Sequence, residues 1–274
     1  MLRLEGVSKA YRVGAFGGRE LVAVRGVDLE VGPGEVISLI GESGSGKSTI
    51  GRMILRLTGV SGGRITFDGV DVAGLTGRRL RAYYADVQGV FQDPFSSYNP
   101  IFKADRVLEV LRQTYFPRLG GQAWRDKVEA SLAAVRLDPG QVLGKFPHQL
   151  SGGQLQRLLV ARALLLNIRL LVADEIISML DASTRIDVLN LLGDLKARGL
   201  GILFITHDLS LGNYISDRAV ILRRGEVVED GPTERVFGEP RHPYTRSLLA
   251  LVPQLHHKWE RTGHGVPEPA GESG

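Results

Sequence analysis

A glycine-rich segment that ends in Lys-Ser-Thr carries the strongest chemical signal in the sequence. Its residues are Gly41, Glu42, Ser43, Gly44, Ser45, Gly46, Lys47, Ser48 and Thr49. Two glycines five positions apart, followed by Lys and Ser, form the pattern of a loop whose backbone N–H groups cradle phosphates. In such a loop Lys47 reaches the β- and γ-phosphates, and the hydroxyl of Ser48 is a ligand for Mg²⁺. The segment therefore predicts binding of ATP with Mg²⁺.

Two adjacent carboxylates, Asp174 and Glu175, follow an apolar run at residues 170–173. Asp174 suits the shell of ligands around Mg²⁺, whereas Glu175 could polarise the water that attacks the γ-phosphate. A solvated strand end would have the same composition, so this pair alone does not decide between the two interpretations. Together with the phosphate loop it favours hydrolysis, which needs both a metal ligand and a positioned water.

The elements that must position these residues are strands followed by helices. Residues 36–40 form a short apolar run that leads into the phosphate loop, and a helix is expected from about Lys47. This context favours a true phosphate loop over a glycine-rich turn with an incidental lysine. Strand-like runs at 170–173, 202–206 and 219–222 alternate with a helical pattern at 186–197. Such alternation predicts a mainly parallel sheet, with the carboxylates at the carboxyl end of one strand.

The rest of the chain shows three other patterns. Apolar residues alternate at Leu2, Leu4 and Val7 and again at Val27, Leu29 and Val31, which predicts two short strands separated by a glycine-rich turn at 14–18. Residues from about 100 to 165 have helical periodicity, which predicts an inserted helical subdomain. Beyond Pro253 the chain is polar and rich in Gly, Pro and Glu, so we expect a loosely ordered tail.

Composition excludes several classes. The 274 residues, 43% of them hydrophobic, can bury a large core, and the absence of cysteine excludes disulfides and cysteine-ligated metal centres. The longest apolar stretch, 158–173, is interrupted by Arg162, Asn167 and Arg169, so we expect no membrane span. Residues 1–10 lack the pattern of a secretory signal, which favours the cytosol. A net charge of +4 is too mild to indicate nucleic-acid binding.

A second loop narrows the class. Ser151, Gly152, Gly153 and Gln154 follow Leu150 and precede a helical stretch expected at 154–166, so their backbone N–H groups can form another anion site. This loop resembles the signature loop of the ATP-binding-cassette (ABC) family. The resemblance implies an α/β fold of the P-loop NTPase class. That fold has a RecA-like, mainly parallel sheet, an N-terminal antiparallel β-subdomain and an inserted α-helical subdomain. It also implies a head-to-tail dimer in which this loop contacts the γ-phosphate bound to the opposite subunit.

The resemblance assigns further residues. Tyr11 corresponds to the aromatic residue that stacks on adenine, and Gln92 to the glutamine that joins the metal site to the helical subdomain. The segment 178–181 resembles the loop that crosses the dimer interface. His207 matches the switch histidine, which contacts the γ-phosphate and helps to hold the attacking water. Taken alone, each has a plainer interpretation, because a tyrosine after a strand, a glutamine in a turn or a histidine after a strand is often structural.

Three positions depart from the family pattern. Ile168 and Ile176 stand where prolines are usual, and Met179 stands where a small residue is usual. Because proline fixes φ, its absence could loosen the loop between Glu175 and Asp181 and lower turnover.

Three longer segments resemble the ATPase subunits of peptide and nickel uptake systems. They are residues 91–100, 147–151 and 240–249, the last with the sequence Pro-Arg-His-Pro-Tyr-Thr-Arg-Ser-Leu-Leu. A plain surface helix with a proline start is the alternative for the last segment. The resemblance implies a nucleotide-binding domain at 1–252, with a helical subdomain at about 93–165, a C-terminal extension at about 230–252 and a tail at 253–274.

The resemblance also implies partners and a location. The expected partners are a second ABC ATPase subunit, either a copy or a paralogue, two transmembrane permease subunits, and an extracytoplasmic substrate-binding protein that acts indirectly. The chain would lie at the cytoplasmic face of the inner membrane and power import, with peptides favoured over nickel as cargo.

Two other functions compete with the importer subunit. Soluble ABC ATPases of DNA repair usually carry long coiled coils or zinc cysteines between the phosphate and signature loops, and the short stretch from Lys47 to Ser151 has neither. An ATP-gated regulatory module with little turnover is the third interpretation, and it depends on the three departures.

Overall fold

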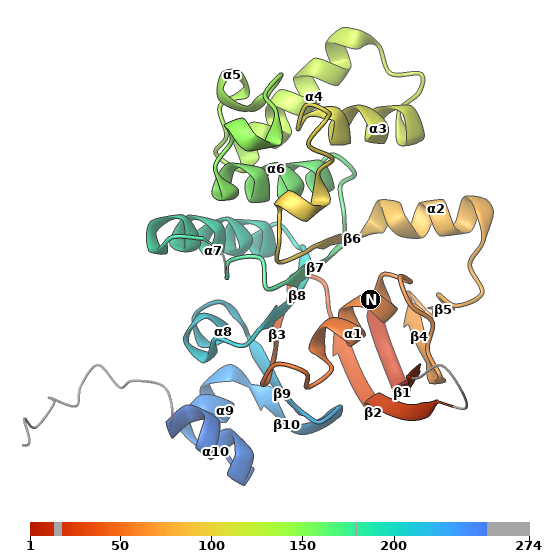
Figure 1. The fold of residues 1–274 in the computed structure, drawn as a ribbon, viewed down its shortest axis with the longest axis vertical. Coiled ribbons are helices and arrows are strands. Elements are labelled where there is room, and N and C mark those ends of the chain that lie inside the picture. The colour runs from red at the N-terminus through yellow and green to blue at the C-terminus, as the bar shows by residue number, and fades with distance from the viewer. Residues whose placement is uncertain (14–17, 179, 251–274) are drawn as a thin grey trace, which may run out of the picture.

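The computed structural model describes residues 1–13, 18–178 and 180–250. The predictions for Met179, for most of the 14–18 turn and for the 253–274 tail lie outside these residues. The described chain folds into two sheets and a set of helices (Figure 1). Among the described helices, none has the length and apolar character that a bilayer span requires.

The larger sheet carries the residues expected to do chemistry. In spatial order its six strands are β10 (Glu226–Pro232), β9 (Arg218–Arg223), β3 (Val36–Ile40), β8 (Gly201–Thr206), β7 (Leu170–Asp174) and β6 (Val87–Val90). All neighbouring pairs are parallel except β10 and β9. Every residue of β3, β7 and β8 is buried, which explains why these strands are almost entirely apolar in sequence. The prediction of a mainly parallel sheet is confirmed.

The smaller sheet is antiparallel and is formed mainly by the N-terminal region. Its strands, in order, are β2 (Arg19–Val31), β1 (Leu2–Val13), β4 (Gly62–Phe67) and β5 (Val70–Asp71). Leu2 pairs with Val31 and Leu4 with Leu29, so the alternating apolar residues meet on one buried face. The two N-terminal strands are confirmed, but both are longer than the alternating residues indicated.

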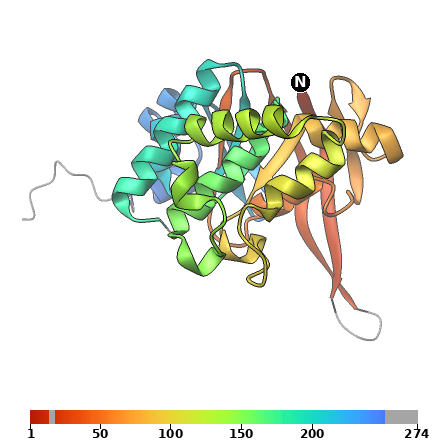
Figure 2. The same cartoon turned by 90° about the horizontal axis from the view of Figure 1, so that it is seen from above.

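Helices occupy the stretch between β6 and β7, as the periodicity predicted. They are α3 (Arg106–Tyr115), α4 (Gly121–Ala134), α5 (Pro139–Val142) and α6 (Gly152–Leu164), with short 3-10 turns at Phe95–Ser97 and Pro147–Gln149. Figure 2 looks onto this helical region, with the sheets behind it. The expected helix at 154–166 is therefore α6, shifted by two residues toward the N-terminus.

The remaining helices flank the strands. They are α1 (Lys47–Ile54), α2 (Gly77–Asp86), α7 (Ala182–Ala197), α8 (Leu209–Ile215), α9 (Thr233–Gly238) and α10 (Pro243–Ala250). Helix α1 contacts β7 and β8, and α8 contacts β3 and β8. The loops at the carboxyl ends of β3, β7 and β8 therefore lie together, where ligands collect in parallel sheets.

Candidate functional site

The phosphate loop connects β3 to α1 and depends on its glycines. Gly44 and Gly46 have φ angles of +78° and +107°, in the region that favours glycine. A Cβ atom at Gly46 would lie 2.5 Å from the carbonyl oxygen of Ala23, and one at Gly41 would lie 2.2 Å from that of Leu222. Backbone packing thus excludes a side chain at both ends of the loop.

Lys47 is the first residue of α1, and its ammonium group returns to the start of the loop. Its Nζ atom donates to the carbonyl oxygens of Gly41, at 2.7 Å, and Glu42, at 2.9 Å. Burial lowers the pKa of Lys47, and the carboxylates of Glu175 and Asp174 oppose this shift in part. The residue is 4% exposed, so its positive charge is concentrated inside the loop, where phosphates would bind.

Ser48 and Asp174 meet across the site. The Oγ atom of Ser48 donates to Oδ1 of Asp174 at 3.1 Å, although one residue belongs to α1 and the other ends β7. Burial raises the pKa of Asp174, and the hydrogen bond from Ser48 acts against this rise. A hydroxyl and a carboxylate are oxygen ligands of the type that Mg²⁺ prefers.

The described residues contain no group of three or more His, Cys, Asp or Glu side chains suited to hold a metal alone. Mg²⁺ usually keeps several waters and takes other ligands from substrate phosphates, so one or two oxygens from the protein are enough. Ser48 and Asp174 therefore fit the metal. The expected third ligand, Gln92, is exposed and lines a cavity that Ser48 also lines.

Glu175 and His207 form the other side of the site. The Oε1 atom of Glu175 lies 3.1 Å from Nδ1 of His207. The backbone of Glu175 has a φ of +51°, and its N–H donates to the carbonyl oxygen of Ile205 at 2.9 Å. Since β-sheet pairing holds the strand to this point, the left-handed turn at Glu175 directs its carboxylate toward the cavity.

One cavity of about 630 Å³ unites most of the expected residues. It is lined by Ala23, Ile40, Gly41, Glu42, Ser43, Gly44, Gly46, Lys47, Ser48, Thr49, Gln92, Glu175, His207, Leu209 and Leu248. Ser45 is buried beside it, and its Oγ atom has no hydrogen-bond partner among the described residues. The cavity offers Lys47, the N-terminus of α1, the carboxylates of Glu42 and Glu175, and His207, a set suited to hydrolysis of a bound phosphoanhydride; Asp174 is not among the lining residues but contacts Ser48, which is.

Tyr11 is not brought to this cavity. It lies on β1 opposite Leu21, and the ammonium of Lys9 lies 5.0 Å from the centre of its ring. The contact with adenine therefore stays a prediction.

The signature loop also lies away from the cavity of its own chain. Ser151 is the N-cap of α6: its Oγ accepts from the N–H of Gln154 at 3.2 Å, while Oε1 of Gln154 accepts from the N–H of Ser151 at 2.9 Å. A Cβ atom at Gly153 would lie 2.5 Å from Cγ2 of Thr184, so α7 packs tightly against the start of α6. Ser151, Gly152, Gly153 and Gln154 thus form a capped helix start, and their contact with a nucleotide stays a prediction.

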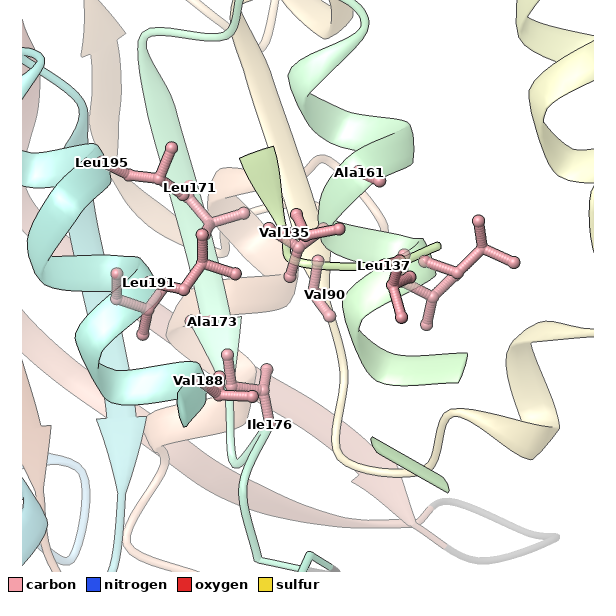
Figure 3. Close-up of a cluster of buried hydrophobic side chains, with 14 of the residues drawn as sticks. Val90, Val135, Leu137, Ala161, Leu171, Ala173, Ile176, Val188, Leu191 and Leu195 are labelled. Atoms are coloured by element: carbon pink, nitrogen blue, oxygen red, sulfur yellow. The ribbon is translucent and has the colours of Figure 1, made fainter. Parts of the chain in front are cut away.

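Ile176 lies in the hydrophobic core, where it is 1% exposed. It packs in one cluster with Ala173 and Val188 (Figure 3). After it, both the N–H and the Oγ of Ser178 donate to the carbonyl oxygen of Glu175, and Arg185 donates to the carbonyl oxygens of Ser178 and Leu180. These contacts tie Ser178 to Glu175, and Ser178 and Leu180 to α7. The effect of the isoleucine at this position on turnover stays a prediction.

Asp181 has a structural task at the end of this loop. It is the N-cap of α7, and its carboxylate accepts from the hydroxyl of Ser183 and from the N–H and hydroxyl of Thr184. These hydrogen bonds, led by the one from Ser183, lower the pKa of Asp181. The helix expected at 186–197 therefore begins four residues earlier, at Ala182.

Sequence reasoning missed the apolar residues of the cavity. Ala23, Ile40, Leu209 and Leu248 line it, and Leu248 belongs to α10 in the C-terminal extension. The sequence His-Pro-Tyr at residues 242–244 indicated this extension, but nothing in those residue types predicts a contact with the cavity.

Comparison with known protein families gives two matches. A family model described as "ABC transporter" matches residues 24–178. A second model, described as "Oligopeptide/dipeptide transporter, C-terminal region", matches residues 228–272.

Similar proteins cover most of the chain. The oligopeptide transport ATP-binding protein OppF of Salmonella typhimurium is 40% identical over 236 residues, which are 86% of this chain and 70% of OppF. The glutathione import ATP-binding protein GsiA of Escherichia coli is 44% identical over 237 residues, or 86% of this chain and 38% of GsiA. Among solved structures, the ATP-binding cassette MJ0796, a dimer in a post-hydrolysis state bound to ADP and Pi, has a TM-score of 0.76 at 29% identity. That match covers 85% of this chain and 99% of the MJ0796 chain.

Proposed function

The chain belongs to the ABC transporter family of ATP-binding proteins, and on that premise we propose that it is the ATP-hydrolysing subunit of a peptide importer. The observation that carries the ATPase part is the single cavity in which Lys47, Ser48, Glu175 and His207 meet. The importer part is supported by the oligopeptide/dipeptide transporter model that matches residues 228–272 and by the likeness to OppF.

Hydrolysis is assigned to groups around this cavity. The phosphate loop binds the phosphates through its N–H groups and through Lys47, whose ammonium moves from the carbonyls of Gly41 and Glu42 to the ligand. Glu175 orients the attacking water and takes up its proton, while His207, 3.1 Å from Glu175, holds the carboxylate and contacts the γ-phosphate.

Mg²⁺ would be held by Ser48 and Asp174, with Gln92 able to join, and when bound it offsets the negative charge of the phosphates. The separation of Ser151 from the cavity of its own chain supports a composite site. In the proposed head-to-tail dimer, Ser151, Gly152, Gly153 and Gln154 reach the γ-phosphate held by the other subunit, and Tyr11 stacks on adenine. The dimeric state of MJ0796 supports this arrangement.

The proposed assembly has membrane partners that this chain does not provide. Two permease subunits span the membrane, an extracytoplasmic binding protein delivers the cargo, and the ATPase sits peripherally at the cytoplasmic face of the inner membrane. The helical region at about 93–165 is the proposed subdomain that transmits closure of the dimer to the permeases. The segment at about 230–252 is the proposed importer-type extension of a nucleotide-binding domain that spans 1–252.

The test is ATP hydrolysis by the purified chain, first alone and then with a paralogous ATPase subunit and the permease subunits in lipid vesicles. We expect hydrolysis to rise several-fold in the assembly, to rise again with peptide-loaded binding protein, and to vanish in Glu175→Gln. Stimulation by a nickel-loaded binding protein but not by a peptide-loaded one would contradict peptides as the cargo and leave the ATPase role intact. Nucleotide binding without hydrolysis in any assembly would contradict the ATPase role and favour a regulatory module.

A further inference from the structure

The C-terminal extension packs against the two loops that form the nucleotide site. Tyr244 of α10 and Val236 of α9 share a buried cluster with Ile40, the last residue of β3, and with Leu209, the first residue of α8. Ile40 directly precedes the phosphate loop, and Leu209 follows His207 by two positions. Helices α9 and α10 lie beside β9 and β10 at one end of the molecule (Figure 1). The segment is therefore more than a surface helix that starts with proline.

A buried carboxylate fixes the start of α10. Glu229 of β10 accepts hydrogen bonds from the backbone N–H groups of Arg241, at 2.9 Å, and His242, at 3.1 Å, and it pairs with Arg235 at 3.3 Å. Its side chain is 4% exposed. Burial would raise the pKa of Glu229, but the hydrogen bonds and Arg235 outweigh burial, so the pKa lies below its usual value. The extension thus has a fixed position relative to the sheet.

Tyr244 joins this fixed extension to the phosphate loop. Its hydroxyl oxygen accepts from the backbone N–H of Glu42 at 3.3 Å, and its ring, 6% exposed, lies under the guanidinium of Arg223 at 4.7 Å. The carbonyl oxygen of the same Glu42 accepts from Lys47 and from the N–H of Ser45. Glu42 is therefore held on one side by the extension and on the other by the residues that bind phosphate.

The bond to Tyr244 does not depend on Lys47. Tyr244 contacts the N–H of Glu42, whereas Lys47 contacts its carbonyl oxygen, so the two hydrogen bonds use different groups of the same residue. One turn further along α10, Leu248 lines the cavity itself. A loop held in place before its ligand arrives binds that ligand with a smaller loss of conformational entropy.

We propose that the C-terminal extension is a working part of the nucleotide site. Tyr244 is a positioning residue that pre-organises the phosphate loop through Glu42, and Leu248 supplies an apolar wall of the cavity. This inference rests on the proposed function, because it takes the ligand to be a nucleotide. It states that the extension increases the affinity of the site for that nucleotide.

The experiment compares the full-length wild-type chain with Tyr244→Phe, Leu248→Ala and the control Tyr115→Phe. Tyr115 lies on α3 and does not line the cavity, and its hydroxyl donates to the carbonyl oxygen of Arg81 at 3.4 Å, so the control also removes a tyrosine hydroxyl that bonds to the backbone, here as a donor. Calorimetric titration with Mg·ADP and Mg·ATP gives Kd, thermal melting without nucleotide gives Tm, and hydrolysis gives kcat and KM.

We expect Tyr244→Phe to raise the Kd for both nucleotides about three- to tenfold, the amount expected for one hydrogen bond. We expect the KM for ATP to rise in parallel and kcat to stay within about twofold, since the loop holds phosphates in ground and transition states alike. Leu248→Ala should also raise Kd, because it removes part of the apolar wall of the cavity. Tyr115→Phe should leave Kd unchanged, and the Tm of Tyr244→Phe should stay within about 2 °C of the wild type.

Unchanged Kd values in both Tyr244→Phe and Leu248→Ala, with a wild type that binds ATP, would overturn the inference and leave the proposed function intact. A rise in Kd matched by an equal rise for Tyr115→Phe would also overturn it, because the effect would then be general. A wild-type chain that binds neither nucleotide would overturn the proposed function and this inference together.

Discussion

Nδ1 of His207 lies 3.1 Å from Oε1 of Glu175, although the two residues are 32 positions apart in the chain. Each follows a neighbouring parallel strand, Glu175 after β7 and His207 after β8, so sheet pairing fixes their separation. A carboxylate next to an imidazole at the edge of this cavity fits the role that we propose for the pair, which is to orient the attacking water.

Glu175→Gln should abolish hydrolysis while preserving binding. The amide keeps the size of the side chain but cannot accept the proton of the attacking water, so we expect kcat to fall by about a hundredfold or more. Steady-state hydrolysis and nucleotide titration together measure the two effects. Glu129→Gln, on the exposed surface of α4, is the control. Normal turnover in the Glu175 variant would exclude this residue as the base.

Lys47→Ala should weaken nucleotide binding by about ten- to a hundredfold, the loss expected for a charge-assisted hydrogen bond. The ammonium is buried, and its partners are carbonyl oxygens of the loop. Among the described residues no other lysine lines the cavity, so none can replace it. Titration with Mg·ADP measures the change. Lys145→Ala, an exposed position in the helical region, should bind as the wild type does. Equal affinity of the Lys47 variant and the wild type would place the phosphates elsewhere.

Ser151→Ala should damage the site of the partner subunit and not that of its own chain. In a dimer of this chain, mixing Ser151→Ala with Glu175→Gln should therefore restore hydrolysis above either variant alone. The mixed dimer retains one site with an intact Glu175 on one chain and an intact Ser151 on the other.

The variants are mixed at increasing ratios, and phosphate release is measured. Since Ser151 also caps α6, with a cap worth about 1 kcal/mol, the melting temperature of the variant is measured in parallel. Where a paralogue completes the dimer, Ser151→Ala in this chain should lower hydrolysis at the paralogue's phosphate loop. No recovery in a mixture of folded homodimeric variants would contradict the composite site.

Glu229→Gln should destabilise the protein at neutral pH by about 1–2 kcal/mol, because a charged acceptor of two N–H groups and an ion-pair partner is lost. The pKa of Glu229 is lower in the folded chain than its ordinary value of 4.5. Its stabilising contribution is therefore complete above pH 4.5 and is lost as the pH falls through the lower, folded pKa.

The difference in unfolding free energy between wild type and Glu229→Gln should consequently shrink at acid pH. Chemical denaturation at neutral pH and at about pH 4, where the carboxyl of the unfolded chain is largely protonated, measures it. Glu226→Gln, on the same strand but exposed, is the control and should change stability by less than about 0.5 kcal/mol. A gap that widens at acid pH would contradict the assigned direction.

The sequence predicted the parts of the site that local pattern determines. The phosphate loop lies within nine consecutive residues, and Glu175 and His207 each follow a fully buried strand, so motif and strand end together placed them. Ser151 was expected just before a helix at 154–166, but its capping pair with Gln154 was not predicted, although a serine followed three positions later by glutamine typically starts a helix.

The parts that were missed depend on contacts between distant segments. Glu42 and Tyr244 are 202 positions apart, and no spacing rule connects them. Ile176 was considered only as a replacement for proline. Its burial in one cluster with Val188 of α7 depends on how two elements pack, which the sequence pattern does not show. Strands β5 and β6 have only two and four residues, and β4, β10 and the helix α2 mix polar with apolar residues, so periodicity did not detect them.

The left-handed backbone at Glu175 has a consequence for the evolution of this chain. A residue other than glycine at a φ of +51° costs the fold about 1 kcal/mol or more, and glycine there would remove that cost. At position 175, therefore, the residue that favours thermostability differs from the one that favours turnover. A library selected only for resistance to heat should accumulate glycine or asparagine at position 175, whereas selection for growth on the transported nutrient should return glutamate.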